Sequence, residues 1–191
     1  MIEYSPLRIR TADGKSATWR VEHALVEQDS DAPWWLSLVG PDGVKFDATG
    51  VDLYDCLKQI RRQTEPSGIL LCCNGARRNA RPSGFYGSTL GAVVVYQHHR
   101  WRAAMPWELV DIFGYAPPRK IATVEDQEAY LESVDSFRQS MLPLLNPLQW
   151  ITYGLSVLCY RVLDVRARVR DGRNFSKKNL KKRVGPEQSR S

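Results

Sequence analysis

Residues 34–63, WWLSLVGPDGVKFDATGVDLYDCLKQIRRQ, contain the transition that decides the fold class. The first half alternates apolar and polar residues around a Gly-Pro-Asp-Gly turn at residues 40–43, which predicts two antiparallel strands. From residue 51 to residue 63 the apolar positions recur at helical spacing. The expected buried face carries Leu53, Leu57 and Ile60, and the charged residues expected to face solvent are Lys58, Arg61 and Arg62. Strands followed by a helix that packs on them indicate an α+β fold.

Upstream of this stretch the same strand pattern continues. Residues 7–10 and 18–22 both alternate, and the Ala-Asp-Gly-Lys turn at residues 12–15 separates them. The N-terminal part of the chain, residues 5–48, is therefore predicted to form an antiparallel meander.

Downstream of residue 63 strands and helices intermix. Residues 69–73 are apolar on both faces and predict a central strand, while residues 92–96 predict a second buried strand and residues 110–113 a short third. Thr123 opens a further helix with the spacing of a capping box. We therefore expect a mixed sheet packed by two or three helices, in a single α+β domain over residues 1–140.

The segment from residue 141 to residue 169 is predicted to be an amphipathic helix. Its apolar residues at steps of three and four are Leu148, Ile151, Leu155, Leu158, Val162, Val165 and Val169. Such a stripe favours docking on the protein's own core, and contact with a partner or with a membrane surface is the alternative. Although residues 141–160 carry no charge, prolines and polar side chains dilute their hydrophobicity, so a transmembrane span is not expected.

The charge of the chain is divided unevenly along its length. The 191 residues carry a formal net charge of +6. Residues 161–191 hold 11 basic and 3 acidic residues, net +8, which leaves 16 basic and 18 acidic residues in 1–160, net −2. Residues 170–191 are therefore predicted to be a basic, flexible tail that could contact a polyanion.

Several classes of protein find no support in the sequence. No secretory signal opens the chain and the four cysteines lack metal-binding spacing, so we expect a cytoplasmic protein with no metal and no cofactor. No nucleotide-binding loop or hydrolase motif is present, and no catalytic residue is assigned. One enzymatic alternative stays open: Cys72 or Cys73 could meet His98 or His99 across adjacent strands as nucleophile and base.

The loop after the strand at residues 69–73 has the most chemical content. It supplies three arginines within five positions, together with glycines and a hydroxyl, directly after an apolar strand. Guanidinium groups suit phosphate or carboxylate, and in sheets with parallel strands ligands bind at such strand ends. The candidate residues for binding an anion or a partner are Asn74, Gly75, Arg77, Arg78, Arg81, Ser83 and Gly84.

Two stretches carry a resemblance to a known group of proteins. The first is LCCNGARRN at residues 71–79, followed by Pro-Ser-Gly at residues 82–84, and the second is VDIF at residues 110–113, leading to TVEDQ at residues 123–127. Over roughly residues 50–140 the chain resembles small bacterial immunity-type proteins that are encoded beside polymorphic toxins. The resemblance implies a non-enzymatic protein that neutralises a cognate toxin by direct contact.

Two functions therefore follow from the sequence. The first is an immunity-type binding protein, for which tryptophans such as Trp34, Trp35, Trp101 and Trp107 could serve as interface anchors. In this reading a slightly acidic body meets a basic toxin domain. The alternative is a phosphate- or nucleic-acid-binding domain that uses the Arg77, Arg78 and Arg81 loop together with the basic tail.

Overall fold

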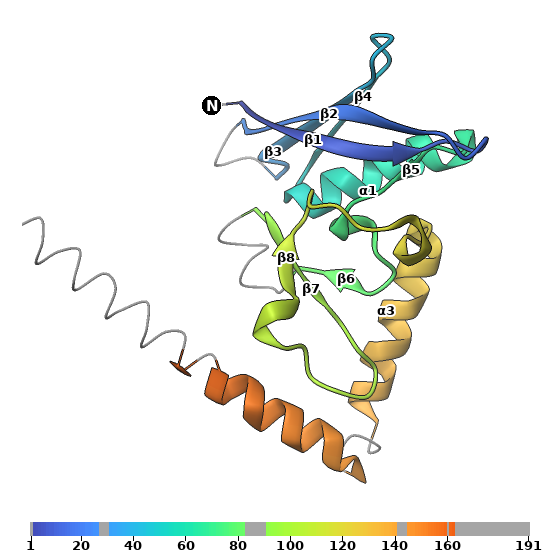
Figure 1. The fold of residues 1–191 in the computed structure, drawn as a ribbon. Helices are drawn as coiled ribbons and strands as arrows, with labels where there is room; N and C mark the ends of the chain where they lie inside the picture. The colour runs from blue at the N-terminus through green and yellow to red at the C-terminus, as the bar shows by residue number, and fades with distance from the viewer. Residues whose placement is uncertain (1, 27–30, 83–90, 141–144, 160, 163–191) are drawn as a thin grey trace, which may run out of the picture.

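The computed structural model describes residues 2–26, 31–82, 91–140, 145–159 and 161–162. Ser83, Gly84 and the basic tail lie outside the described residues. The first half of the chain forms a curled five-stranded sheet of order β4-β3-β2-β1-β5 (Figure 1). Its strands are β1 (Glu3–Arg10), β2 (Ser16–Leu25), β3 (Trp34–Val39), β4 (Lys45–Gly50) and β5 (Leu70–Leu71). The predicted N-terminal meander is confirmed.

Helix α1 (Leu53–Thr64) packs against the inner face of this sheet (Figure 1). It begins where Asp52 accepts a hydrogen bond from the backbone N–H of Asp55 at 2.8 Å, which satisfies one of the free donors of the first turn. The predicted buried face of Leu53, Leu57 and Ile60 is confirmed. The expectation that Arg61 faces solvent is wrong, because Arg61 is 1 % exposed and has partners inside the protein.

A second, three-stranded sheet of order β6-β7-β8 follows. Its strands are β6 (Ala80–Arg81), β7 (Val94–Gln97) and β8 (Leu109–Asp111). Short 3-10 helices connect the elements: η1 (Glu65–Ser67), η2 (Asn74–Ala76), η3 (Pro106–Glu108) and η4 (Pro118–Lys120). Helix α3 (Val124–Gln139) runs alongside the smaller sheet, and Thr123 caps it by accepting from the Asp126 N–H, as the capping-box spacing predicts (Figure 1).

The α+β fold class is confirmed, but two details of the predicted sheet are wrong. Every pairing between the described strands is antiparallel, so the sheet is not mixed. The predicted central strand at residues 69–73 is reduced to β5, which pairs with β1 alone at the end of the sheet. Beyond it, Cys73 forms an isolated bridge with Tyr115, so a loop instead of a further strand covers this edge.

One hydrophobic core extends from the larger sheet through α1 to the smaller sheet. Its fully buried members include Leu7, Ile9, Val21, Leu36, Leu38, Leu53, Ile60, Val95 and Ile112. The core therefore joins residues that are far apart in the sequence, while the domain boundary at residue 140 stays a prediction.

The C-terminal helix covers residues 147–159 and continues at residues 161–162. It lies at the end of the molecule opposite the five-stranded sheet (Figure 1). The expected docking of its apolar stripe on the core is wrong: Leu148, Ile151, Leu155, Leu158 and Val162 are all exposed. The buried side chains of the helix are two polar ones, Thr152 and Ser156, so the helix lies against the body through its polar side.

Candidate functional site

The loop that follows β5 is joined tightly to β8. The backbone N–H of Gly75 donates to the Ile112 carbonyl at 2.9 Å, and the amide nitrogen of Asn74 donates to the Asp111 carbonyl at 2.9 Å. A Cβ atom at position 75 would lie 2.5 Å from Cδ2 of Leu57, closer than carbon atoms pack. Asn74 and Gly75, two of the candidate site residues, therefore hold the loop against the core.

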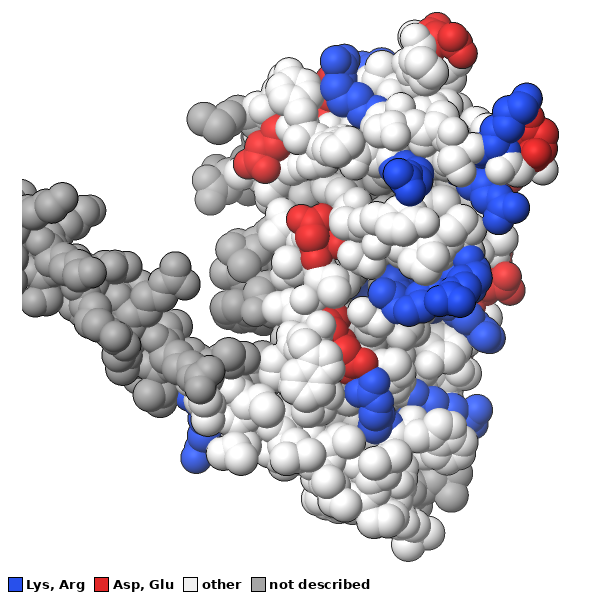
Figure 2. Space-filling view, in the orientation of Figure 1, with Lys and Arg blue, Asp and Glu red and all other residues white. Residues whose placement is uncertain are grey.

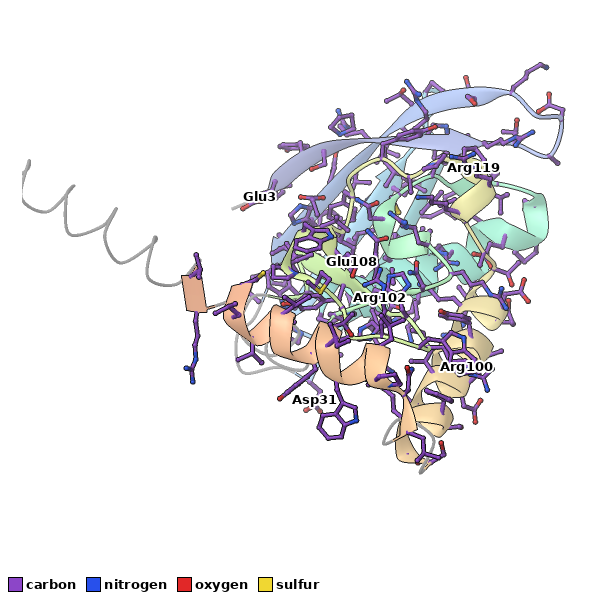
Figure 3. The ribbon with its side chains drawn as sticks, turned by 60° about the horizontal axis from the view of Figure 1, so that its bottom comes forward. Glu3, Asp31, Arg100, Arg102, Glu108 and Arg119 are labelled. Carbon is purple, nitrogen blue, oxygen red and sulfur yellow. The ribbon has the colours of Figure 1, made fainter. Side chains whose placement is uncertain are left out.

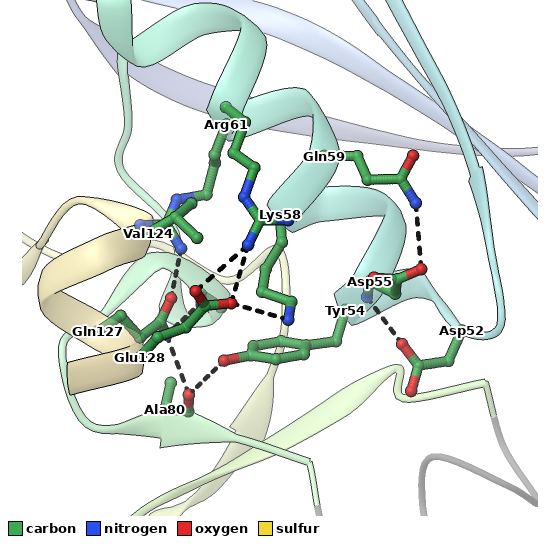
Figure 4. Close-up of polar contacts among 12 residues, drawn as sticks. Asp52, Tyr54, Asp55, Lys58, Gln59, Arg61, Ala80, Val124, Gln127 and Glu128 are labelled. Atoms are coloured by element: carbon green, nitrogen blue, oxygen red, sulfur yellow. Dashed lines mark hydrogen bonds and ion pairs between the residues drawn. The ribbon is translucent and has the colours of Figure 1, made fainter. Parts of the chain in front are cut away.

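A buried glutamine fixes the inner side of this loop (Figure 4). The side-chain nitrogen of Gln127 donates to the carbonyls of Gly75, Arg77 and Ala80 at 3.0, 2.7 and 3.0 Å. Its side-chain oxygen accepts from the buried guanidinium of Arg61. The loop's backbone acceptors therefore point into the protein.

The buried Arg61 extends this network to a carboxylate. It donates to the Ala122 carbonyl at 2.6 Å and to Glu65 at 2.9 Å, and Glu65 in turn accepts from the first N–H of α3, at Val124, at 3.0 Å. A buried guanidinium is tolerated only when a charge partner and further acceptors surround it, and both are present here. The network joins α1, α3 and the loop.

The three arginines of the loop have three different environments. Arg81 makes a bidentate ion pair with Asp135 at 2.7 and 2.9 Å, which lowers the pKa of that carboxyl group. The guanidinium of Arg78 is exposed and lies 4.9 Å from the ring centre of Tyr130. The Nε atom of Arg77 is buried without a hydrogen-bond partner among the described residues. The structure therefore does not direct the three guanidinium groups toward one point, and the anion site stays a prediction.

A polar depression of about 490 Å³ separates α1 from α3, which the sequence did not indicate. Its walls include Tyr54, Lys58, Arg81, Glu128 and Asp135. Lys58 pairs with Glu128 at 3.2 Å, and burial raises the pKa of the Tyr54 phenol to about 12 while its hydroxyl donates to the Ala80 carbonyl (Figure 4). Opposite charges are thus already paired across the depression. No sequence signal could have found it, because α1 and α3 are far apart in the chain.

The proposed meeting of cysteine and histidine does not occur. Burial raises the pKa of the Cys73 thiol to about 11 and also raises that of Cys72, so neither is an activated thiolate. The contacts of His98 and His99 involve other residues: His98 lies beside Arg138, and His99 contacts Glu108 at 2.8 Å. No hydrogen bond between described residues links these thiols to these imidazoles.

Glu108 is a buried carboxyl group that accepts hydrogen bonds from three residues. Burial alone would raise the pKa of this carboxyl, but Arg102, the Met105 N–H and His99 all donate to it and lower the pKa to about 2. Glu108 ends η3 and accepts from the backbone N–H of Met105, the residue that precedes η3; because Met105 is not a capping residue, the sequence carries no signal for this contact. The cluster fixes the conformation of residues 99–108.

The outer face of the five-stranded sheet combines aromatic and basic side chains. Arg20 lies 5.8 Å from the ring centre of Tyr4, and Lys45 lies 5.5 Å from that of Trp35. A depression of about 340 Å³ adjoins this face, lined by Pro6, Arg8, Thr18, Phe113 and Tyr115. Since α1 occupies the opposite face of the sheet, no described helix covers this one (Figure 1).

The four tryptophans named as possible anchors are not equivalent. Trp34 packs against the core and Trp101 stacks edge-on against Phe137. Trp35 is half-buried on the outer face of the sheet, whereas Trp107, in η3, is 68 % exposed. Of the four tryptophans, Trp35 is therefore the one that lies on the uncovered outer face of the five-stranded sheet.

Comparisons with known proteins give no further guidance. No protein-family model matches the chain, and no curated protein matches it either. Within the described ranges, no three or more His, Cys, Asp and Glu side chains are grouped so that they could hold a metal ion. The same ranges contain no helix with the length and apolar character needed to cross a membrane.

Proposed function

We propose that the protein is a non-enzymatic binding protein of immunity type, which neutralises a cognate bacterial toxin through the outer face of the five-stranded sheet. The observation that carries the proposal is the uncovered face, on which Tyr4 and Trp35 each lie beside a basic side chain. Tyrosine, tryptophan and arginine are the residue types that contribute most to protein interfaces. The resemblance of residues 50–140 to immunity-type proteins supports the same function.

The charge of this face suggests the chemistry of the partner. The strands place four basic residues on it, Arg8, Arg10, Arg20 and Lys45, and two acidic residues, Glu22 and Asp47. Glu22 pairs with Arg20 at 2.7 Å and Asp47 pairs with Lys45 at 3.1 Å, so the surplus of positive charge belongs to Arg8 and Arg10. This face would therefore meet an acidic patch on the toxin, although residues 1–160 as a whole are slightly acidic.

Co-expression tests this proposal. A bacterial strain that expresses the toxin domain encoded beside this gene should recover growth when it also expresses the protein. Tyr4→Ala combined with Trp35→Ala should weaken toxin binding by roughly thirtyfold or more, because truncating interface anchors typically costs about 2 kcal/mol or more.

The control is Trp107→Ala, which removes a more exposed tryptophan from a different part of the surface. It should leave rescue and affinity unchanged, and thermal unfolding should show that all variants fold. Absence of rescue by the unaltered protein, or full rescue by the double variant at low expression, would argue against the proposal.

Binding of phosphate or nucleic acid is the second candidate function. It is favoured by one observation: the exposed Arg78 lies next to the exposed η4, since its backbone N–H donates to the Lys120 carbonyl at 3.2 Å. Figure 2 shows a group of basic side chains below the five-stranded sheet. If this function holds, Arg78→Ala should remove the thermal stabilisation produced by inorganic phosphate or by a short RNA.

A further inference from the structure

The C-terminal helix exposes its apolar stripe, which is the side that a helix of a folded protein normally buries. Ile151 is 59 % exposed and Leu158 is 58 % exposed, although both belong to the continuous apolar stripe. Figure 2 shows that the surface in the region of this helix, at the bottom of the view, carries very few charged side chains. A contiguous apolar surface of this kind on a folded protein marks a site of interaction with another protein or with a membrane.

Hydrogen bonds to the body set the orientation of the helix. The backbone N–H of Ala103 donates to the Thr152 hydroxyl at 3.1 Å, and the Ser156 hydroxyl donates to the Ala104 carbonyl at 3.2 Å. Just before the helix, the Asn146 side chain donates to the Trp101 carbonyl at 2.8 Å. Because the body contacts the polar side, the apolar stripe is left facing away from the core.

The segment that receives the helix is itself held in place. Residues 101–104 lie between His99 and Glu108, and Arg102 forms a bidentate ion pair with the buried Glu108. Figure 3 shows the helix in front of the body, with Arg102 and Glu108 behind it. The orientation of the helix is therefore built into the fold.

We propose that the C-terminal helix lies in the surface of an anionic phospholipid bilayer, with its apolar stripe inserted between the lipids and the basic segment 161–191 on the lipid phosphates. The charge of that segment carries the choice of partner, because its net +8 begins at the C-terminal end of the stripe and overlaps it. Apolar insertion and electrostatic attraction to anionic lipids add together in such peripheral binding. Because Thr152 and Ser156 hold the polar side of the helix against the body, only the stripe can enter the lipid, and the helix lies in the plane of the membrane.

Two other occupants fit these observations less well. A second copy of the chain could cover the stripe, but pairing the helices would bring two segments of net +8 together. A nucleic acid would satisfy the basic segment but would leave the apolar stripe in water. The bilayer satisfies both features. It also leaves the outer face of the five-stranded sheet accessible at the far end of the molecule (Figure 1).

Sedimentation of the full chain with lipid vesicles tests the proposal. The protein should bind vesicles of phosphatidylcholine mixed with phosphatidylserine at low salt, and at least tenfold less to phosphatidylcholine alone or at high salt. Ile151→Asp combined with Leu158→Asp should reduce binding at least tenfold, because charges on the stripe cannot enter the acyl region. Replacing Lys177, Lys178, Lys181 and Lys182 by Gln should also reduce binding at least tenfold.

The matched control is Val26→Asp combined with Val44→Asp, which places the same charges at exposed valines outside the helix. It should bind vesicles like the unaltered protein. All variants are checked by thermal unfolding. If the stripe variant does not fold, the lysine variant and the lipid and salt dependence of the unaltered protein decide the question.

Three outcomes would overturn the proposal. The first is an unaltered protein that does not bind the mixed vesicles at low salt. The second is a folded stripe variant that binds them as well as the control does. The third is a dimer in light scattering that the stripe variant dissociates, with no vesicle binding by either protein. None of these outcomes bears on toxin rescue, which depends on a different surface.

Discussion

His98 is an imidazole that the fold keeps uncharged. Burial lowers its pKa most strongly, and the positive charges of Arg81 and Arg138 lower it further, to about 4, against a smaller opposing effect of Asp135. Its backbone is also fixed: its N–H donates to the Asn79 carbonyl at 2.6 Å, and its carbonyl accepts from the Tyr130 hydroxyl. Protonation would therefore place a third positive charge beside two arginines.

This environment predicts an acid-sensitive contribution to stability. Because the pKa of His98 is lower in the folded than in the unfolded chain, its contribution is complete above about pH 6.5 and is lost as the pH falls toward 4. Over that range we expect the free energy of unfolding to fall by about 2 kcal/mol through this residue. Urea unfolding at pH 7, 5.5 and 4.5 measures the loss.

The variant His98→Gln isolates this contribution. It should show a smaller loss of stability between pH 7 and pH 4.5 than the unaltered protein does. The pKa of His23 is lowered as well, mainly by burial, so some pH dependence should remain in the variant. An unchanged pH dependence in His98→Gln would contradict the assignment.

Helix α1 and helix α3 depend on each other through side chains that are far apart in the sequence. Gln127 joins Arg61 to three carbonyls of the loop after β5, and all of these groups are buried or nearly so. Gln127→Leu keeps the size of the side chain and removes every one of these bonds. We expect the variant to lose about 3 kcal/mol of unfolding free energy, because it leaves buried polar groups without partners.

The exposed Gln63 provides the control within α1. Its side chain donates to the Asp47 carbonyl at 3.2 Å in contact with solvent, where water can replace the lost bond. Gln63→Leu should therefore change the stability by about 0.5 kcal/mol or less. Urea unfolding measures both variants. Equal losses of unfolding free energy in Gln127→Leu and Gln63→Leu would contradict the expectation that the buried hydrogen bonds contribute more to stability.

Elements with a clear local pattern could be predicted, whereas their partners could not. The meander and both helices follow from periodicity and capping residues: α1 lies within two residues of the predicted range 51–63, and α3 begins directly after the predicted cap, Thr123. The sequence predicts a solvated Arg61 because a charged residue on a helix normally faces solvent, and nothing local points to its acceptor Gln127, which is 66 positions away. The apolar run at residues 69–73 predicts a central strand, because a covering loop and a covering strand bury its side chains alike.

For the candidate site, the sequence identifies a loop to which the fold gives a structural role, while its binding of an anion or a partner stays a prediction. Asn74 and Gly75 hold the loop to β8, and Arg81 neutralises Asp135. The sequence shows three nearby guanidinium groups, yet their directions depend on α3 and on tertiary contacts that no local pattern encodes. The apolar stripe of the C-terminal helix can likewise be recognised in the sequence. The direction in which it faces depends on the hydroxyl groups of Thr152 and Ser156, which bind the body.

At the scale of the whole molecule, the parts should differ in stability. Helix α1 is buried between the sheet and the loop, whereas the C-terminal helix rests on the body through Thr152 and Ser156. Segments with few buried apolar contacts open more easily than the core. Hydrogen exchange should therefore show faster exchange in residues 147–159 than in Leu53–Thr64 at neutral pH.

Removing the two hydroxyl groups should widen this difference. Thr152→Val combined with Ser156→Ala should increase exchange in residues 147–159 by about tenfold, because two hydrogen bonds to the body are lost. The control Thr49→Val changes an exposed threonine of β4 and should leave exchange in the helix unaltered. Equal exchange rates in the two helices, unchanged by the double substitution, would contradict this division of stability.

The distribution of the cysteines has a practical consequence for studying the helix. All four are free thiols, and Cys56, Cys72 and Cys73 are buried, whereas Cys159 on the C-terminal helix is partly exposed. A maleimide dye added to the native protein should therefore attach to position 159 alone. The native chain thus supplies its own attachment point for a fluorescent reporter on this helix, without any engineered cysteine.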